Sequence, residues 1–473
     1  MEFTTLDEIK IELNNGSLSC EKLVQHYLQN INARKNLNAF IEVYDKEAIA
    51  RAQQVDQKIQ NKTAGRLAGM VIGLKDNLCF KDHGLTASSK ILNDFESLFS
   101  GTAVERLLKE DAIIIGRLNC DEFAMGSSNE FSTYGPVLNP VNETKVPGGS
   151  SGGSATAVAA NLCLATLGSD TGGSIRQPAS FCGVVGFKPS YGRISRHGLI
   201  AYGSSFDQIG PFSHSVKDTA LMYEIMAGAD EFDSTLSRKK IETSNFDSSV
   251  STPKKIGYLK ECLDSDKLDP EIRQEVNTLI EKLKSEGHTV EPVSSPYLDY
   301  LVPVYYVLTT AEASSNLARY DGVHYGYRSP NATDLESTYK LSRTEGFGNE
   351  VKRRIVLGTF VLSSGYYDAY YTQAQKARRL IQDQTNEVFQ KFDFILSPTT
   401  PGTAFDIGRE KTDPTVMYLE DIFTVQANIC GIPAISLPIG QHSNGMPFGI
   451  QLMAAKFAEK ELLEFSDELM NKA

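Results

Sequence analysis

The sequence lacks the segments by which proteins enter or cross membranes. No run approaches the roughly 18 uninterrupted apolar residues that a membrane-spanning helix needs. The first turns of the chain carry four acidic side chains (Glu2, Asp7, Glu8 and Glu12), which fits neither a signal peptide nor an arginine-rich transit peptide. We therefore expect a cytoplasmic protein.

Basic charge is also in deficit, and metal-ligand motifs are missing. The chain has 47 Lys and Arg against 59 Asp and Glu, a formal net charge of -12. A broad cationic face for a phosphate backbone is therefore not expected, and any nucleic acid would be held mainly by a partner.

The 7 cysteines form no CxxC pair, and no HExxH occurs. We expect neither a disulfide scaffold nor a metal site, and we interpret Cys163 and Cys182 as packed thiols.

What the sequence does contain is an alternation of helical and strand patterns. Helical spacing of apolar residues covers 5–30, 45–62, 102–110, 216–227, 270–287, 366–392 and a last segment from 458. Short branched apolar runs predict strands at 70–74, 112–115, 162–167, 184–187, 255–258, 289–293, 394–397, 434–438 and 448–453. This alternation predicts an α/β protein with a largely buried sheet. The polar segment 230–253 is the best candidate for an exposed connector.

One stretch departs from this pattern. Residues 148–210 hold 13 of the 37 glycines, and between Pro147 and Gly186 the only charged side chains are Asp170 and Arg176. Apolar runs interleave with the glycines, so a flexible linker is a poor interpretation. Because glycine permits close approach of other backbone, the stretch predicts a buried site lined by main chain.

The run GLKDN at 73–77 supplies the first candidate group, Lys75. It follows a buried-strand pattern, where a charged amine is costly. Desolvation lowers the pKa of a lysine, and a neutral amine can act as a base. The alternative is a solvated lysine at a strand end, paired with its neighbour Asp76.

Two Gly-Gly-Ser units supply the second and third candidate groups, Ser150 and Ser174. A serine nucleophile needs a base, and acyl transfer needs N–H donors aimed at the developing oxyanion. The run TGGS at 171–174 offers several such amides. The alternative is a pair of tight turns. A nucleophile elbow of the α/β-hydrolase type, with His324 or His442, also matches GxSxG, but the polar segment 139–147 lacks the strand that this motif requires.

Taken together, the three pieces resemble the amidase signature family. The resemblance implies a fold with one large mixed β-sheet covered by helices on both faces, and a Ser–cis-Ser–Lys triad. Carried over by position, Ser174 would be the nucleophile, Ser150 the bridging serine after a cis peptide bond, and Lys75 the base. The oxyanion would lie on amides of the loop that contains Thr171, Gly172, Gly173 and Ser174. A single amidase domain, 1–473, would comprise N-terminal helices (1–62), a signature core (65–215), the connector (230–254) and a second half (255–473).

Further segments resemble one branch of this family, the A subunits of glutamyl-tRNA(Gln) amidotransferases. They are DEFAMGSS at 121–128, EGFGNEVKRRI at 345–355, SGYYDAYY at 364–371 and DIFTVQANICGIP at 421–433. Val141 departs from the pattern, since relatives often carry tryptophan there. By this resemblance Arg354 would hold the α-carboxylate of glutamine and Asp421 its ammonium, with Tyr305 nearby. A solvated helix face is the alternative for Arg354, and a helix start is the alternative for Asp421.

The resemblance also implies partners. Ammonia released from glutamine would pass through a tunnel to a B subunit, where ATP and Mg²⁺ activate Glu-tRNA(Gln), and a small C subunit would complete a heterotrimer. No cofactor is expected in this chain itself. A stand-alone amidase of a small amide and a catalytically silent scaffold protein remain as alternatives.

Overall fold

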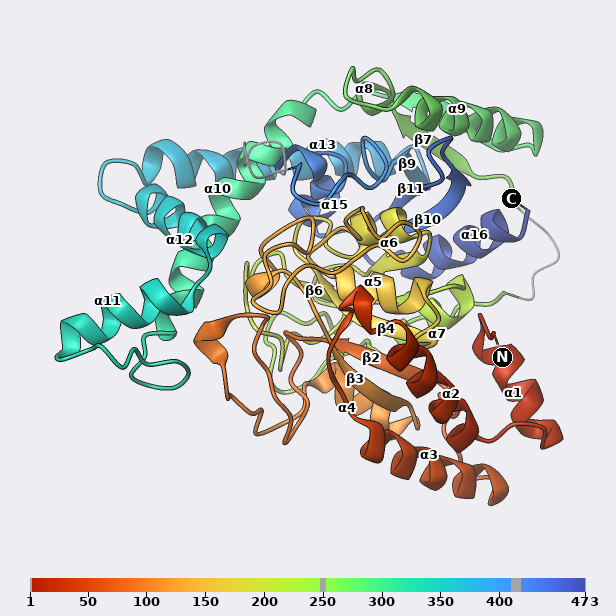
Figure 1. Cartoon of the computed structure of the whole chain (residues 1–473). Coiled ribbons are helices and arrows are strands. Elements are labelled where there is room, and N and C mark those ends of the chain that lie inside the picture. The colour runs from red at the N-terminus through yellow and green to blue at the C-terminus, as the bar shows by residue number, and fades with distance from the viewer. Residues whose placement is uncertain (1, 247–251, 410–417, 473) are drawn as a thin grey trace.

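The computed structural model describes residues 2–246, 252–409 and 418–472, and its centre is one mixed β-sheet (Figure 1). Eleven strands of the described residues form this sheet. They are β1 (Phe40–Val43), β2 (Val71–Lys75), β3 (Ile113–Leu118), β4 (Ala165–Asp170), β5 (Val185–Lys188), β6 (Gln208–Ser213), β7 (Lys255–Leu259), β8 (Thr289–Val293), β9 (Phe394–Pro398), β10 (Ala434–Gln441) and β11 (Pro447–Ala454). The predicted α/β class with a large mixed sheet is confirmed.

The strand order places the signature residues at the middle of one half of the sheet. The order is β1-β3-β2-β4-β6-β5-β10-β11-β9-β7-β8. β2 lies between β3 and β4 and is parallel to both, whereas the central run from β4 to β9 is antiparallel. Parallel neighbours end at the same edge, so Lys75 at the end of β2 and Asp170 at the end of β4 emerge side by side.

Helices cover both faces of the sheet. Successive strand residues point to opposite faces, and on β5 a Cβ at Gly186 would meet Ala179 of α6, while the ring of Phe187 packs edge-on against Tyr223 of α7. One face is therefore covered by α5 (Gly152–Ala159) with α6 (Arg176–Cys182), and the other by α7 (Val216–Met226) with α16 (Glu459–Lys472). The helices on both faces that the sequence resemblance implies are confirmed.

The remaining helices surround this core. They are α1 (Leu6–Asn15), α2 (Cys20–Ala33), η1 (Lys35–Leu37), α3 (Asp45–Gln60), η2 (Lys90–Leu92), α4 (Thr102–Lys109), η3 (Glu122–Ala124), α8 (Lys260–Leu263), α9 (Pro270–Ser285), α10 (Leu298–Asn316), η4 (Leu317–Arg319), α11 (Leu335–Gly346), α12 (Asn349–Val361), η5 (Asp368–Thr372), α13 (Gln373–Phe389) and α15 (Val425–Cys430). None of those in the described ranges is both long and apolar enough to span a membrane.

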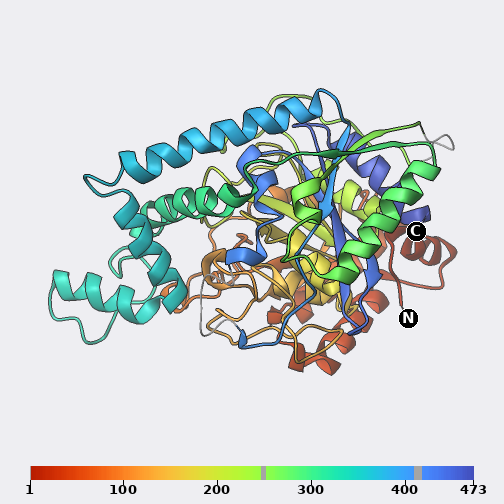
Figure 2. The ribbon, with the colours of Figure 1, turned by 90° about the horizontal axis from the view of Figure 1, so that it is seen from above.

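A group of helices projects from one side of the sheet. In Figures 1 and 2, α10, α11, α12 and α13 extend together away from the strands. α10 packs against both α12 and α13, and its middle turns are buried. This group supplies one wall of the candidate site, although the sequence patterns predicted only α13 within it.

Two helix predictions needed correction. The predicted helix 5–30 is two helices, because Gly16 takes a left-handed conformation (φ 79°) that ends α1. The predicted helix 366–392 begins with a π-helical turn, η5, before α13.

The remaining sequence predictions concern the exposed connector, the division of the chain into segments and the two packed cysteines. The described part of the connector is irregular, and its residues 247–251 lie outside the described ranges. The division of the chain into segments stays a prediction. Cys163 and Cys182 are buried free thiols, as predicted.

Candidate active site

Lys75 is completely buried at the end of β2. All five residues of this strand are buried, and burial lowers the pKa of the Lys75 amine to about 8. Its neighbour Asp76 is not its counterion. The Asp76 carboxylate accepts instead from Arg117 Nη1 at 2.7 Å and from the N–H of Thr86 at 3.0 Å. The alternative of a solvated lysine paired with Asp76 is therefore wrong.

Three serine hydroxyls surround the Lys75 amine. Nζ lies 2.7 Å from Ser150 Oγ, 2.9 Å from Ser151 Oγ and 3.0 Å from Ser169 Oγ. Ser151 donates its own proton to the Ser169 carbonyl at 3.1 Å, and Asn77 Nδ2 donates to Ser169 Oγ at 2.9 Å. A neutral amine has two N–H donors and one lone pair. In its neutral form the amine can therefore give its two N–H groups to Ser151 and Ser169 and turn its lone pair toward Ser150.

The peptide bond between Gly149 and Ser150 is cis, as the family resemblance implies. The N–H of Asp121 donates to the Ser150 carbonyl at 3.1 Å, and the N–H of Gly149 donates to Gln177 Oε1 at 2.9 Å. A Cβ at Gly149 would overlap with the Asp121 carboxylate, which explains why glycine stands there. These contacts fix Ser150 against Lys75.

Ser174 lies in a loop that Asp170 holds at the end of β4. The Asp170 carboxylate accepts from the N–H of Gly173 at 2.8 Å and from that of Ile175 at 3.1 Å, on either side of Ser174. Burial alone would raise the pKa of Asp170, but the ion pair with Arg176 outweighs it and lowers that pKa to about 2. The carboxylate therefore stays charged, and the loop stays fixed.

Ser174 differs from the other two signature residues in its accessibility. Its side chain is 8% exposed, against 0% for both Lys75 and Ser150. The hydrogen bonds of the described residues include none between Ser150 and Ser174. The predicted oxyanion residues lie together in this loop, where the amide of Gly173 already donates to Asp170. Thr171, Gly172 and Ser174 therefore remain as amides for an oxyanion.

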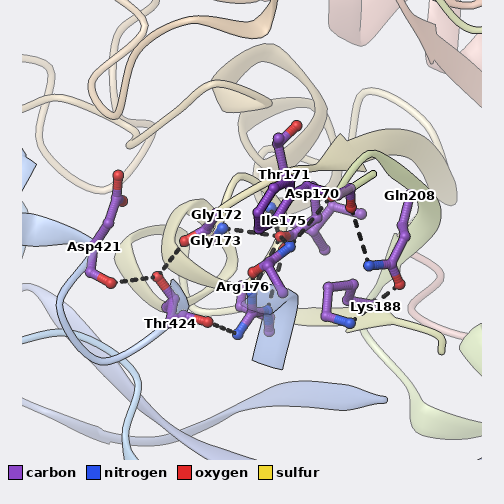
Figure 3. Close-up of polar contacts among 12 residues, drawn as sticks. Asp170, Thr171, Gly172, Gly173, Ile175, Arg176, Lys188, Gln208, Asp421 and Thr424 are labelled. Carbon is purple, nitrogen blue, oxygen red and sulfur yellow. Dashed lines mark hydrogen bonds and ion pairs between the residues drawn. The ribbon is translucent and has the colours of Figure 1, made fainter. Parts of the chain in front are cut away.

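The serine loop is tied to the segment that carries Asp421 (Figure 3). Thr424 Oγ1 donates to the Gly172 carbonyl at 2.7 Å and also lies 3.0 Å from the Asp421 carbonyl. Arg176 Nη1 donates to the Thr424 carbonyl at 2.8 Å. Two segments about 250 residues apart in sequence thus form one rigid corner of the site.

Arg354 is buried on α12, with only 2% of its surface exposed. Its Nε donates to Glu350 Oε1 at 2.8 Å and its Nη1 to the Tyr202 hydroxyl at 2.8 Å. Its Nη2 is buried and has no hydrogen-bond partner among the described residues. The alternative of a solvated helix face is therefore wrong, and a buried cationic donor is left for a ligand.

Asp421 is also buried, and burial raises its pKa to about 7. Ser127 Oγ donates to Asp421 Oδ2 at 2.9 Å, and the Tyr306 hydroxyl lies 3.4 Å from the same oxygen. The Tyr306 ring also lies 5.2 Å from Arg354 Cζ. One tyrosine therefore contacts both the candidate cation and the candidate anion.

Tyr305 has a different position from its neighbour. It is buried, and a Cβ at Gly172 would overlap with its ring, so the ring packs directly against the serine loop. The sequence singled out Tyr305, but Tyr306 is the residue in contact with Asp421. Ser127 and Tyr202 were likewise missed, because their roles depend on contacts across more than 100 residues and leave no local pattern.

Comparisons with known proteins agree with this geometry. The family model described as Amidase matches residues 22–463. The A subunit of the glutamyl-tRNA(Gln) amidotransferase of Chlorobium phaeobacteroides (strain DSM 266) is 49% identical over 466 residues, covering 98% of both chains. The protein of the same name from Chlorobium limicola is 47% identical, with 100% of both chains covered.

Solved structures show the same relationship. The crystal structure of the A subunit of the glutamyl-tRNA(Gln) amidotransferase from Thermotoga maritima superimposes with a TM-score of 0.78 at 40% identity, covering 94% of this chain and 90% of that one. A peptide amidase from Stenotrophomonas maltophilia gives a TM-score of 0.81 at 27% identity, covering 98% and 96%. With its buried lysine, cis-serine and serine loop in one site, the chain belongs to the amidase family.

Proposed function

We propose that this chain is the glutamine-hydrolysing A subunit of a glutamyl-tRNA(Gln) amidotransferase. The single observation that carries the proposal is the buried cation Arg354 and the buried acid Asp421 on either side of Tyr306, since a site for free glutamine needs one cation and one anion. The names of the full-length relatives support the same choice.

The unpartnered Nη2 of Arg354 suits the α-carboxylate of glutamine. Arginine holds a carboxylate through two parallel hydrogen bonds, and burial strengthens such a pair. Asp421 would take the α-ammonium, whose charge favours the ionised form of this carboxyl. Held at both ends of its backbone, glutamine would direct its side-chain amide toward the serine loop, to which Thr424 ties the Asp421 segment.

Lys75, Ser150 and Ser174 would then perform acyl transfer. The neutral Lys75 amine takes the Ser150 proton while Ser150 takes that of Ser174, and Ser174 Oγ attacks the side-chain amide carbon. The oxyanion is stabilised by N–H groups of the loop that begins at Thr171. Return of the proton to nitrogen breaks the C–N bond and releases ammonia, leaving a glutamyl ester on Ser174. Water, activated by the same base, hydrolyses this ester to glutamate.

The ammonia would serve a reaction in a partner protein. Conversion of Glu-tRNA(Gln) to Gln-tRNA(Gln) requires an activated carboxylate, which ATP and Mg²⁺ supply, and we assign them to a B subunit. Together with a small C subunit, the two chains would form a cytoplasmic heterotrimer. The net charge of -12 supports this division, because tRNA would be held chiefly by the partner.

The test is the substitution Ser174→Ala in the complex with candidate partner subunits. We expect loss of glutamine-dependent amidation of Glu-tRNA(Gln), while amidation fed by ammonium chloride persists. The ammonia-fed reaction is the internal control, because it needs the same fold and the same partners. Loss of both activities in an intact complex, or survival of both, would contradict the proposal.

The same preparation separates the two alternatives. A stand-alone amidase would purify without partner chains and hydrolyse small amides alone. A silent scaffold would leave its serines unlabelled by a fluorophosphonate probe, whereas the proposed nucleophile should react and Ser174→Ala should not.

A further inference from the structure

Tyr202 lies beside Arg354 in the segment that leads into β6. It is 1% exposed, and its hydroxyl accepts from Arg354 Nη1 at 2.8 Å. The same hydroxyl donates to Thr309 Oγ1 at 3.1 Å, and Thr309 donates in turn to the Tyr305 carbonyl at 2.8 Å. The Tyr202 hydroxyl thus accepts one hydrogen bond and donates another, and it connects α12 to α10.

The backbone of Tyr202 is attached to the serine loop through Asp207. The N–H of Tyr202 donates to Asp207 Oδ2 at 2.9 Å, and Thr171 Oγ1 donates to Asp207 Oδ1 at 2.7 Å. The N–H of Gly203 donates to Oδ1 as well, at 3.1 Å. Asp207 is buried and directly precedes β6, whose first residue, Gln208, pairs with Asp170.

These contacts form one continuous path with a donor group at each end. At one end Arg354 presents its unpartnered Nη2, and at the other Thr171 begins the loop that would stabilise the oxyanion. Because every member is buried and hydrogen-bonded, the path fixes the separation between the two ends. A substrate gripped by Arg354 is thereby held at a set distance from the reacting loop.

We propose that Tyr202 is a positioning residue that makes the α-carboxylate of the substrate contribute to kcat and not only to binding. The inference rests on the proposed function. Binding energy from a remote part of a substrate raises kcat only when it is used to orient the reacting carbon. The Tyr202 hydroxyl would fix the position of Arg354 relative to the serine loop, so that binding of the carboxylate orients the reacting amide carbon.

The test compares two substrates in the variant Tyr202→Phe, which removes one hydroxyl and keeps the ring. The substrates are glutamine and 4-aminobutanamide, which has the same side-chain amide and the same ammonium but no carboxylate. Ammonia release is measured in the complex with its partner subunits and tRNA. We expect kcat for glutamine to fall about tenfold or more, since a hydrogen bond to a charged group is lost. The kcat for 4-aminobutanamide should stay within about twofold of the wild-type value.

The control is Tyr191→Phe, which removes another tyrosine hydroxyl in the same part of the chain. That hydroxyl donates a hydrogen bond to the Ser204 carbonyl at 2.9 Å. This variant should leave kcat unchanged for both glutamine and 4-aminobutanamide. Thermal unfolding should show that both variants are folded. Equal losses for the two substrates in Tyr202→Phe, or a rise in KM for glutamine at unchanged kcat, would overturn the inference alone. A wild-type complex that releases no ammonia from glutamine would overturn the proposed function, and the inference with it.

Discussion

At the scale of single residues, three fully buried groups have pKa values that differ from their ordinary values, and not all of these shifts have the direction that burial alone gives. It lowers the pKa of Lys75 to about 8 and raises that of Asp421 to about 7. Asp170 is just as buried, but Arg176 brings its pKa down to about 2. The difference lies in the partners: hydroxyls around Lys75 and Asp421 leave them titratable near neutral pH, whereas a guanidinium keeps Asp170 charged.

The pKa of Lys75 predicts how glutamine hydrolysis depends on pH. A base acts in its neutral form, and lysine loses its proton above its pKa. The kcat/KM for glutamine should therefore rise as pH increases toward about 8 and level off above it. Lys75→Arg, which stays charged, should lower kcat by about a hundredfold or more. A profile that is flat between about pH 6 and 9 would contradict the assignment of Lys75 as base.

Arg354 gives a prediction about substrate binding. Arg354→Lys keeps the charge but loses the planar pair of donors. We expect KM for glutamine to rise about tenfold or more and kcat to fall, whereas amidation fed by ammonium chloride should keep its rate. A KM that stays at the wild-type value would show that the α-carboxylate binds elsewhere.

At the scale of elements, the serine loop depends on the charged pair that follows β4. Asp170→Asn would leave Arg176 buried without its full counter-charge, which costs about 3–5 kcal/mol. We expect a lower midpoint in urea unfolding together with a lower kcat. The folded-state pKa of Asp170 is depressed, so its contribution to stability is full above the unfolded value of about 3.9 and is lost as pH falls toward about 2. An unchanged urea midpoint would contradict this role.

The start of α12 offers a second prediction at this scale. The buried carboxylate of Glu122 accepts from the N–H of Gly348 at 2.8 Å, directly before the helix that carries Arg354. A Cβ at Gly348 would overlap with this carboxylate. Gly348→Ala should therefore displace the helix, raise KM for glutamine by about tenfold and lower kcat as well. Gly402→Ala, where a Cβ would meet nothing, is the matched control and should leave KM unchanged. Equal KM values for both variants would argue against the helix position as a determinant.

Prediction from the sequence succeeded where a pattern is local. The strands β2 to β5 and β7 to β11 were found from short apolar runs, and Lys75, Ser150 and Ser174 from glycine-rich runs around them. β1, β6, α10, α11 and α12 were missed. β6 carries Gly210 and Pro211, which strands disfavour, and α12 buries Glu350 and Arg354 while its apolar Val356 is exposed, so its apolar residues do not mark its buried face. Tyr306 and Tyr202 were missed because only tertiary contacts distinguish them from other tyrosines.

At the scale of the whole molecule, the sheet and the projecting helices supply different parts of the site. The ends of β2 and β4 place the lysine and the serine loop, while the projecting helices α10 and α12 carry Tyr306 and Arg354. The reacting groups therefore stand on the rigid core, and substrate recognition on helices packed beside it.

The charge of the chain gives a prediction for the assembly. With a net charge of -12, the chain alone should not retard tRNA in a gel at physiological ionic strength, whereas the complex with its partners should. Retardation by the isolated chain, weakened by added salt, would show that it holds tRNA itself.

The most direct test of the whole account is to capture the covalent intermediate. The complex is quenched in acid during glutamine turnover, digested and mapped by mass spectrometry. We predict one glutamyl ester, on the peptide containing Ser174, released by hydroxylamine and absent from Ser174→Ala. A glutamyl group on Ser150, or continued turnover with no acylated serine, would contradict the account.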